Sequence, residues 1–228
     1  MPEKLLVAGG VAAGLSAASA AKRLKKDMEV IVFEKSEWIS YGACSIPYFV
    51  SDIIKKPEDL VVIPPEKFEK ERDIRIKLLH EVVEIDPEAR TLKVKNLRED
   101  KDLVYSYDYL VIGTGALATR PPIPGSHLEK IFTLRTLTDG IAIKNTIHEE
   151  SPSRAVIVGG GYIGLEMAEA FHERGLQVTI IEMLDHILGT MDDEICQEVE
   201  AELDHHGVKL YKSTTVKSFE GSNGKVSK

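Results

Sequence analysis

The sequence predicts an α/β fold with two Rossmann-like βαβ units, and three observations carry this prediction. An apolar run, KLLVAGG, ends in glycines and is followed by a helix-forming run and a second apolar strand, EVIVFE. The same order of strand, glycine turn, helix and strand recurs 150 positions later, with Gly159 in the place of Gly9. Both second strands end in an acid, Glu34 or Glu182.

Each glycine turn suits the pyrophosphate of a dinucleotide. This group is doubly negative, and a helix N-terminus attracts it through unpaired backbone N–H groups and the helix dipole, provided that no side chain blocks the approach. The second turn has the complete G-x-G-x-x-G pattern, whereas Val11 replaces the middle glycine of the first. The turn residues expected to bind a dinucleotide are Gly9, Gly10, Val11, Ala12, Ala13 and Gly14 in the first copy, and Gly159, Gly161 and Gly164 in the second.

The acid that ends each second strand is expected to bind an adenosine ribose. Glu34 lies 20 residues after the last glycine of its turn and Glu182 lies 18 residues after its own. A carboxylate there accepts hydrogen bonds from both ribose hydroxyls and repels a 2′-phosphate. Because MLDHIL, the segment after Glu182, contains no arginine or lysine, the second site should prefer NADH over NADPH. In the alternative interpretation, the glycines only form turns and the acids are solvated strand ends.

Shorter elements are predicted between the two units. EKFEKERDI is typical of a solvated helix, and the stretches VVEIDPEARTLKVKN and LVYSYDYLVIGTGA predict a small antiparallel insertion that returns to a buried strand. TRPPIPGS is a stiff connection because it contains three prolines. We expect a first unit over residues 1–120, a connection and the start of an inserted unit over 121–150, and a second unit over 151–228.

Only one of the two cysteines has surroundings that suit a reactive thiol. Cys44 and Cys196 lie 152 positions apart, without the spacing of a disulfide framework or a zinc site, which favours a reducing cytoplasm. Cys196 falls beside a predicted apolar helix stripe of Ile195, Val199 and Leu203, so we expect it to be packed. Cys44 lies between small residues in SYGACSIPY, where an inert core thiol and a reactive thiol both remain open.

Composition excludes two classes of partner. A net charge of -8 gives no basic face that would bind nucleic acid. After the N-terminal region, no apolar run is long enough to span a membrane. The first residues resemble a signal peptide, but the order of strand, glycine turn, helix and strand favours a folded unit. With 43% hydrophobic residues, 228 residues suffice for one large or two ordinary domains.

Taken together, these motifs resemble the two-dinucleotide flavoproteins of the pyridine nucleotide-disulfide oxidoreductase family, along essentially all 228 residues. The motifs are GGVAAG with Glu34, SYGACSIPY, YDYLVIGTGA, FTLRTLTD, and GGGYIGLEMAE with Glu182. The resemblance implies an N-terminal unit that binds FAD and an inserted unit that binds NADH. Members with a redox disulfide carry C-x-x-x-x-C, but Phe49 stands five residues after Cys44, so the chain is similar to the single-cysteine branch. That branch contains coenzyme A-disulfide reductases, NADH-dependent persulfide reductases, NADH oxidases and NADH peroxidases.

Within that branch, the Pro47-Tyr48 pair is most similar to the coenzyme A-disulfide and persulfide reductases. The resemblance implies that hydride passes from NADH through FAD to sulfur at the catalytic residue Cys44, at the start of a short helix whose dipole would favour the thiolate. It further implies that Tyr162 covers the nicotinamide pocket and that Glu166 faces the flavin. The other residues that the resemblance implies in cofactor binding are Lys35, Val82, Thr114, Gly115, Arg135 and Ile163.

A coenzyme A substrate needs cations for its phosphates. Arg23 and Arg72 match positions with that role in coenzyme A-disulfide reductases, and Ser40 is a third implied substrate residue; an ordinary solvated surface would explain the two arginines equally well. The chain departs from those enzymes at Gly42 and Ala43, where they often place an amide-bearing side chain before the cysteine. The sulfur substrate therefore stays open.

Two alternative functions remain. An NADH oxidase or peroxidase would cycle Cys44 through sulfenic acid, and a dinucleotide-binding module would bind NADH without catalysis. The chain ends in an expected hairpin around Asn223-Gly224, whereas the family's chain continues to a G-D motif that binds the flavin and to a dimerisation domain. We therefore expect the N-terminal portion of a longer chain that is homodimeric at full length, with the C-terminal dimerisation domain absent.

Overall fold

The computed structural model describes residues 2–227 and divides into two compact units. The first unit comprises Met1–Gly42 and Glu58–Leu117, and the second comprises Ala43–Pro57 and Ala118–Lys228. The change of unit after Leu117 lies close to the boundary expected at residue 120. The short segment Ala43–Pro57 differs from that expectation, because it packs with the second unit although the sequence order places it inside the first.

The first unit contains two helices and two sheets. Its elements are β1 (Lys4–Ala8), α1 (Ala12–Leu24), β2 (Glu29–Glu34), the 3-10 turn η2 (Pro57–Leu60) at the unit boundary, α3 (Pro65–Arg72), β3 (Arg75–Leu78), β4 (His80–Asp86), β5 (Thr91–Asn96), β6 (Lys101–Ser106) and β7 (Tyr109–Ile112).

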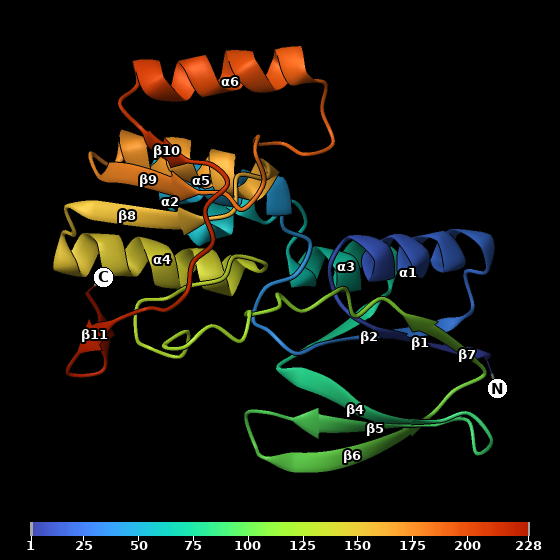
Figure 1. The fold of residues 1–228 in the computed structure, drawn as a ribbon. Coiled ribbons are helices and arrows are strands. Elements are labelled where there is room, and N and C mark those ends of the chain that lie inside the picture. The colour runs from blue at the N-terminus through green and yellow to red at the C-terminus, as the bar shows by residue number, and fades with distance from the viewer. Residues whose placement is uncertain (1, 228) are drawn as a thin grey trace. The chain divides into compact units, whose positions relative to one another are not determined.

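A parallel sheet in the order β3-β2-β1-β7 forms the middle layer of this unit, with α1 and α3 on one face and the antiparallel sheet β4-β5-β6 on the other (Figure 1). Successive side chains of a strand point to opposite faces, so β1 serves both layers. Val7 packs in one core with Leu15 of α1, while the neighbouring Leu6 packs in another with Leu92 and Val94 of β5. The predicted βαβ unit, solvated helix and antiparallel insertion are confirmed.

The second unit contains the inserted βαβ and the segment that carries Cys44. Its elements are the 3-10 turn η1 (Ala43–Ser45), α2 (Ile46–Val50), α4 (Leu137–Glu150), β8 (Arg154–Val158), α5 (Tyr162–Glu173), β9 (Gln177–Ile181), α6 (Asp193–His205), β10 (Lys209–Tyr211), β11 (Gly221–Ser222) and β12 (Lys225–Val226).

A parallel sheet in the order β10-β9-β8 forms the centre of the second unit. Ala168 of α5 packs with Val178 and Ile180 of β9, and Leu203 of α6 reaches the same core. β11 and β12 pair antiparallel around Asn223, which has a φ of 52°, and Gly224, which has a φ of 79°. Positive φ at both positions is typical of a tight hairpin turn, so the predicted turn is confirmed.

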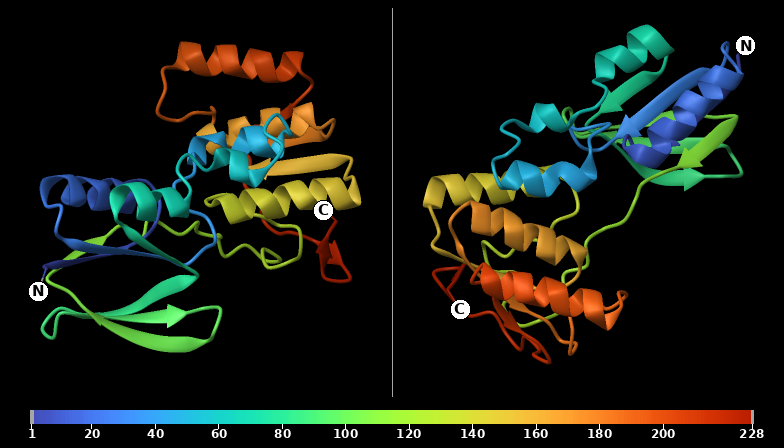
Figure 2. Two further views of the ribbon diagram at one scale, coloured as in Figure 1. Left: turned by 180° about the vertical axis from the view of Figure 1, so that it is seen from behind. Right: turned by 90° about the horizontal axis from the view of Figure 1, so that it is seen from above.

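The segment with Cys44 lies along helices of the second unit. Figure 2 shows this light-blue segment, which contains α2, beside α4 and α5 in both views. Ile46, Phe49 and Val50 are buried in this packing. Within residues 2–227, no helix has the length and apolar character needed to cross a membrane.

Candidate functional site: two glycine turns, a surface pocket and an exposed thiol

The first glycine of each turn has a backbone conformation that side chains rarely adopt. The φ angle is 110° at Gly9 and 109° at Gly159, so the two copies of the predicted repeat have the same local geometry. A Cβ on Gly14 would lie 1.9 Å from the carbonyl oxygen of Gly9, and one on Gly164 would lie 2.1 Å from that of Gly159. The helix of each unit therefore starts in direct contact with its turn.

Gly161 is open, whereas Gly160 and Gly164 of the same turn are crowded. A Cβ there would meet no heavy atom of the described chain within 4 Å. Gly161 is the N-cap of α5, and across residues 2–227 no side chain caps the start of either α1 or α5. Uncapped helix starts leave backbone N–H groups unpaired, and the open space at Gly161 lets an anion reach them. These turns therefore fit the pyrophosphate of a dinucleotide.

Both predicted acids are buried and tie the second strand of each unit to its glycine turn. Glu34 accepts hydrogen bonds from the backbone N–H groups of Gly10 at 2.8 Å and Ser36 at 2.9 Å. Glu182 accepts the equivalent bonds from Gly160 at 2.7 Å and Leu184 at 2.8 Å. A carboxylate oxygen has two lone pairs, so each acid can still accept a bond from a ribose hydroxyl. The tie to the turn is a second role that the sequence pattern did not reveal.

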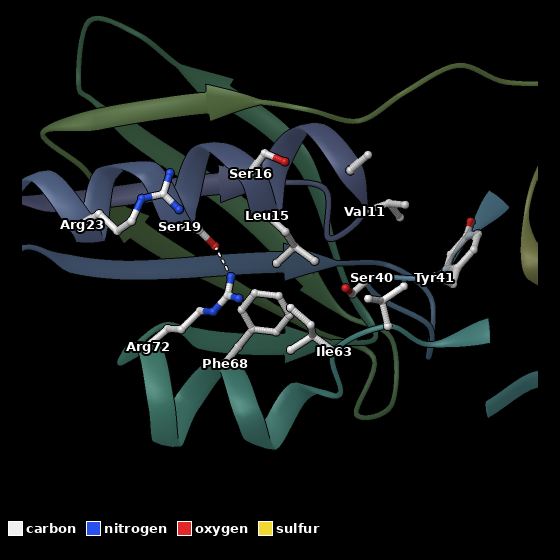
Figure 3. A pocket seen from close by; sticks show the side chains of 12 residues that line it. Val11, Leu15, Ser16, Ser19, Arg23, Ser40, Tyr41, Ile63, Phe68 and Arg72 are labelled. Carbon is white, nitrogen blue, oxygen red and sulfur yellow. Dashed lines mark hydrogen bonds between the residues drawn. The ribbon is translucent and has the colours of Figure 1, made fainter. Parts of the chain in front are cut away.

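A surface pocket of about 370 Å³ in the first unit brings together the three predicted substrate residues. Figure 3 shows Val11, Ser40 and Tyr41 at one end of the pocket and Arg23 and Arg72 at the other. Helix α1 lines the pocket from Ala12 to Arg23, a rise of about 16 Å at 1.5 Å per residue. The pocket therefore suits an elongated ligand with negative charge at one end. It is lined by Val11, Ala12, Leu15, Ser16, Ser19, Arg23, Ser40, Tyr41, Val62, Ile63, Phe68 and Arg72.

Arg72 is held in place at the charged end of this pocket. Its Nη1 donates to Oγ of Ser19 at 2.9 Å, and its guanidinium carbon lies 5.1 Å from the centre of the Phe68 ring. Ser19 is buried, which fixes its hydroxyl on α1. Arg23 is exposed and forms no ion pair with any residue between 2 and 227, so its charge is available to a ligand. Sequence reasoning missed Ser19, whose only signal is its position four residues before Arg23 on the same helix.

The two cysteines have opposite environments. Cys44 is exposed in the turn η1, which leads directly into α2, whereas Cys196 is 2% exposed. Cys196 packs with Ile187 and Leu188, as predicted for a packed thiol. The predicted stripe was wrong at Ile195, which is 48% exposed, because Cys196 occupies the inward position that leads on to Val199.

Most of the other predicted cofactor residues are exposed. Lys35, Thr114 and Gly115 are exposed at the ends of β2 and β7, and Arg135 is exposed before α4. Val82 pairs with Val94 and joins the core between the two sheets of the first unit. In the second unit, the exposed residues Tyr162, Ile163 and Glu166 lie on the first turns of α5.

Gly113 belongs to the first site but was missed in the sequence. Its carbonyl oxygen would lie 2.1 Å from a Cβ on Gly9, and its N–H donates to Ala8 at 2.7 Å. The first glycine turn is therefore packed against the YLVIGTGA turn. The small residues in both turns were the available signal.

Comparison with known proteins decides between the families that share this fold. Residues 3–228 match the pyridine nucleotide-disulphide oxidoreductase family. The chain belongs to this family. Members of this family use FAD and NAD(H), and the two glycine turns with their acids fit these two dinucleotides.

Relatives within the pyridine nucleotide-disulphide oxidoreductases include sulfur reductases and an oxidase. The chain is 42% identical to a CoA-dependent NAD(P)H sulfur oxidoreductase of Pyrococcus furiosus, over 96% of this chain and 48% of the relative. It is 36% identical to an NADH oxidase of Methanocaldococcus jannaschii, over 96% of this chain and 49% of the relative. The structure of an NAD-dependent persulfide reductase from A. fulgidus superposes with a TM-score of 0.92 at 34% identity, over 98% of this chain and 42% of that one. The chain thus spans about half the length of the curated relatives it matches.

Proposed function

We propose that this chain forms the dinucleotide-binding part of an FAD- and NADH-dependent reductase of coenzyme A disulfide or persulfide, with Cys44 as the redox thiol. The observation that carries this proposal is the pocket along α1, which gathers Arg23, Arg72 and Ser40. Coenzyme A carries a pyrophosphate and a 3′-phosphate at one end and a long arm that ends in sulfur at the other. The two guanidinium groups suit the phosphates, because Arg binds phosphate oxygens through charge-assisted hydrogen bonds.

Each dinucleotide has its own unit in this proposal. FAD binds at the turn of the first unit with Glu34, and NADH binds at the turn of the second unit with Glu182. FAD supplies a two-electron relay between NADH and sulfur when it is bound. Tyr162 covers the nicotinamide, and Glu182 selects NADH because its buried charge repels a 2′-phosphate. One relative has NAD(P)H in its name, so the preference for NADH over NADPH has to be measured on this chain itself.

Cys44 performs the sulfur chemistry. Its thiolate attacks one sulfur of coenzyme A disulfide, so that a Cys44–coenzyme A disulfide forms and one coenzyme A thiolate leaves. Two electrons from NADH then break this mixed disulfide, which returns the Cys44 thiolate and releases the second coenzyme A. Exposure of Cys44 allows the attack. The thiol must stay reduced at rest, which a reducing cytoplasm would ensure. We also propose that the full-length chain is a homodimer.

Mixed-disulfide formation tests the proposal directly. The native chain is incubated with coenzyme A disulfide, and the adduct on Cys44 is measured by mass spectrometry over time. We expect an adduct that forms at least five times more slowly in Arg72→Met and in Arg23→Met. Arg98→Met is the matched control, because Arg98 is an exposed arginine outside the pocket. Equal rates in all four proteins would reject the coenzyme A site.

An NADH oxidase is the second candidate, supported by the relative of that name and by the exposed thiol. In that case peroxide or oxygen would convert Cys44 to sulfenic acid. A dimedone adduct on Cys44, formed while coenzyme A disulfide leaves the thiol unchanged, would favour this function. A third candidate is a module that binds NADH without FAD. Incubation of the chain with FAD, followed by desalting, tests this candidate, because retained flavin would exclude it.

A further inference from the structure

A cluster of charged side chains joins the Cys44 segment to two helices of the second unit. Its centre is Asp52, two residues after α2, and its cations come from α4 and from the end of α5. Oδ1 of Asp52 lies 2.9 Å from Nζ of Lys144, and Oδ2 lies 3.3 Å from Nη1 of Arg174. Lys55 of the same turn donates to Oδ2 at 2.9 Å. The carboxylate is thus shared by three cations from three parts of the unit.

Lys144 is the most completely bonded of these cations. Besides Asp52, its ammonium group donates to the carbonyl oxygens of Ile54 at 3.0 Å and Lys55 at 3.1 Å. These three partners match the three N–H groups of an ammonium. The same Nζ lies 4.1 Å from the ring centre of Phe49, and the side chain is 13% exposed. A lysine with every donor used and little contact with water holds its partners in one arrangement.

A second contact lies one helical turn away on the same face of α4. Gly140 precedes Lys144 by four residues, and a Cβ on Gly140 would lie 2.5 Å from Cγ2 of Ile46. Ile46 is two residues after Cys44 and is 3% exposed. Thus α4 contacts the segment near its start through Gly140 and near its end through Lys144. Thr136 and Asp139 fix the beginning of α4 with a capping box, so the helix itself is a firm support.

We propose that Lys144 and Asp52 are positioning residues for Cys44, which hold the segment from Ile46 to Lys55 on α4 so that the thiol presents one orientation to a large disulfide. The inference rests on the proposed function only in taking Cys44 as the reacting thiol. Asp52 belongs to this segment, and Lys144 bonds to Asp52 and to the carbonyl oxygens of Ile54 and Lys55, so both residues act on Cys44 through the backbone of the segment. The pKa of Asp52 agrees with this role, since hydrogen bonds from Lys144 and then Lys55 lower it to about 2.

The variants separate positioning from general stability. Lys144→Met removes the ammonium but keeps an unbranched side chain against Phe49, and Lys144→Arg keeps the charge. Asp52→Asn removes the central charge and retains a residue type that tolerates the positive φ of 73° at this position. Lys212→Met is the matched control, because Lys212 pairs with Glu200 in the same unit, away from the segment.

The first measurement is hydrogen exchange of the segment in the native chain. The amides of Ser51 and Ile54 donate to Pro47 and Tyr48 at 2.8 and 2.9 Å, and they report whether the segment is held. We expect their exchange to become at least tenfold faster in Lys144→Met and Asp52→Asn, to be largely restored in Lys144→Arg, and to stay unchanged in Lys212→Met. Exchange in β8 and β9 should not change in any variant. Unchanged exchange at both amides would overturn the proposal.

The second measurement compares two reagents on Cys44. Iodoacetamide is small and needs only an exposed thiol, so its rate should stay within twofold of wild type, whereas coenzyme A disulfide should react at least fivefold more slowly in Lys144→Met and Asp52→Asn. If the reaction rates with both reagents fall to the same extent, or if neither rate changes, the positioning role is overturned. Rapid labelling of the buried Cys196 would reveal an unfolded Lys144→Met protein, and Asp52→Asn then decides. If wild-type Cys44 fails to react with coenzyme A disulfide, the proposed function is wrong, and hydrogen exchange alone decides whether Lys144 holds the segment.

Discussion

Gly160 donates its backbone N–H to the buried carboxylate of Glu182 over 2.7 Å, and Gly10 makes the same bond to Glu34 over 2.8 Å. The acid at the end of the second strand is therefore part of the glycine turn in both units. One carboxylate orders the turn, and in the proposed function the same carboxylate binds a ribose. Loss of the acid should affect the fold and the choice of nucleotide together.

Replacing Glu182 by alanine is expected to weaken NADH binding by about ten- to a hundredfold, because a hydrogen bond to a charged group contributes about 1.5–3 kcal/mol. The preference over NADPH should fall, since the repulsion of the 2′-phosphate disappears. The buried N–H group of Gly160 and the partly buried one of Leu184 also lose their acceptor, which should lower the free energy of unfolding by about 1–3 kcal/mol. Fluorescence titration with both nucleotides and urea unfolding check these results. Glu169→Ala, an exposed change on α5, is the control, and equal affinity of the wild type for NADH and NADPH would refute the role of Glu182.

The double βαβ pattern could be predicted from the sequence because its signals are local. Glycine spacing, apolar strands and terminal acids all fall within 30 residues in each copy. The error at Ile195 shows the limit of this reasoning, because Ile195 and the neighbouring Cys196 fit a helical apolar stripe almost equally well. In the structure Cys196 packs against Ile187 and Leu188, and Ile195 is exposed.

The pocket and the charged cluster could not be derived from local pattern. Arg23 and Arg72 lie 49 positions apart, and only the resemblance to a family paired them before the fold did. Lys144 and Asp52 lie 92 positions apart, and neither stands in a recognisable motif. Their contact forms because the Cys44 segment packs on α4 in the second unit. No local sequence pattern indicates this tertiary packing.

Alkylation should distinguish the two cysteines in the native chain. Cys44 is exposed and Cys196 is 2% exposed, so iodoacetamide near neutral pH should label Cys44 at least a hundredfold faster. In 6 M urea, roughly a concentration that unfolds small domains, both should react at similar rates. Peptide mass spectrometry over time gives both rates from one sample. Faster labelling of Cys196 would contradict the assignment of Cys44 as the redox thiol.

The ion pairs of Asp52 predict a specific loss of stability in acid. The pKa of Asp52 falls from its usual value of 3.8 to about 2, because Lys144 and Lys55 stabilise the charged carboxylate in the folded state. A carboxylate whose pKa is lowered in the folded state stabilises the fold at pH values above its pKa in the unfolded chain. This stabilisation is lost as the pH falls from about 4 to about 2. Hydrogen bonds from Lys22, Lys95 and His186 also lower the pKa values of Asp73, Asp100 and Asp185, so the wild type and every variant lose stability in this pH range.

The contribution of Asp52 is isolated by the difference between wild type and Asp52→Asn. Wild type should have the higher urea midpoint at pH 6, and the difference between the two midpoints should shrink steadily from pH 4 to pH 2. Urea titrations at five pH values measure it. A difference that stays constant across this range would mean that the carboxylate charge of Asp52 does not stabilise the fold.

Two glycines of the same turn should separate folding from nucleotide binding. Serine at position 164 would bring its Cβ to 2.1 Å from the carbonyl oxygen of Gly159, and such overpacking costs about 1–3 kcal/mol. The Cβ of a serine at position 161 would have open space, and serine is a favoured N-cap residue, so Gly161→Ser should change the free energy of unfolding by less than about 0.5 kcal/mol. Its side chain nevertheless fills the approach to the start of α5 and takes the N–H groups that a pyrophosphate would use. We therefore expect Gly161→Ser to keep the wild-type urea midpoint while weakening NADH binding at least tenfold, and Gly164→Ser to lower the midpoint. If Gly161→Ser binds NADH with wild-type affinity, the pyrophosphate does not approach the chain at Gly161.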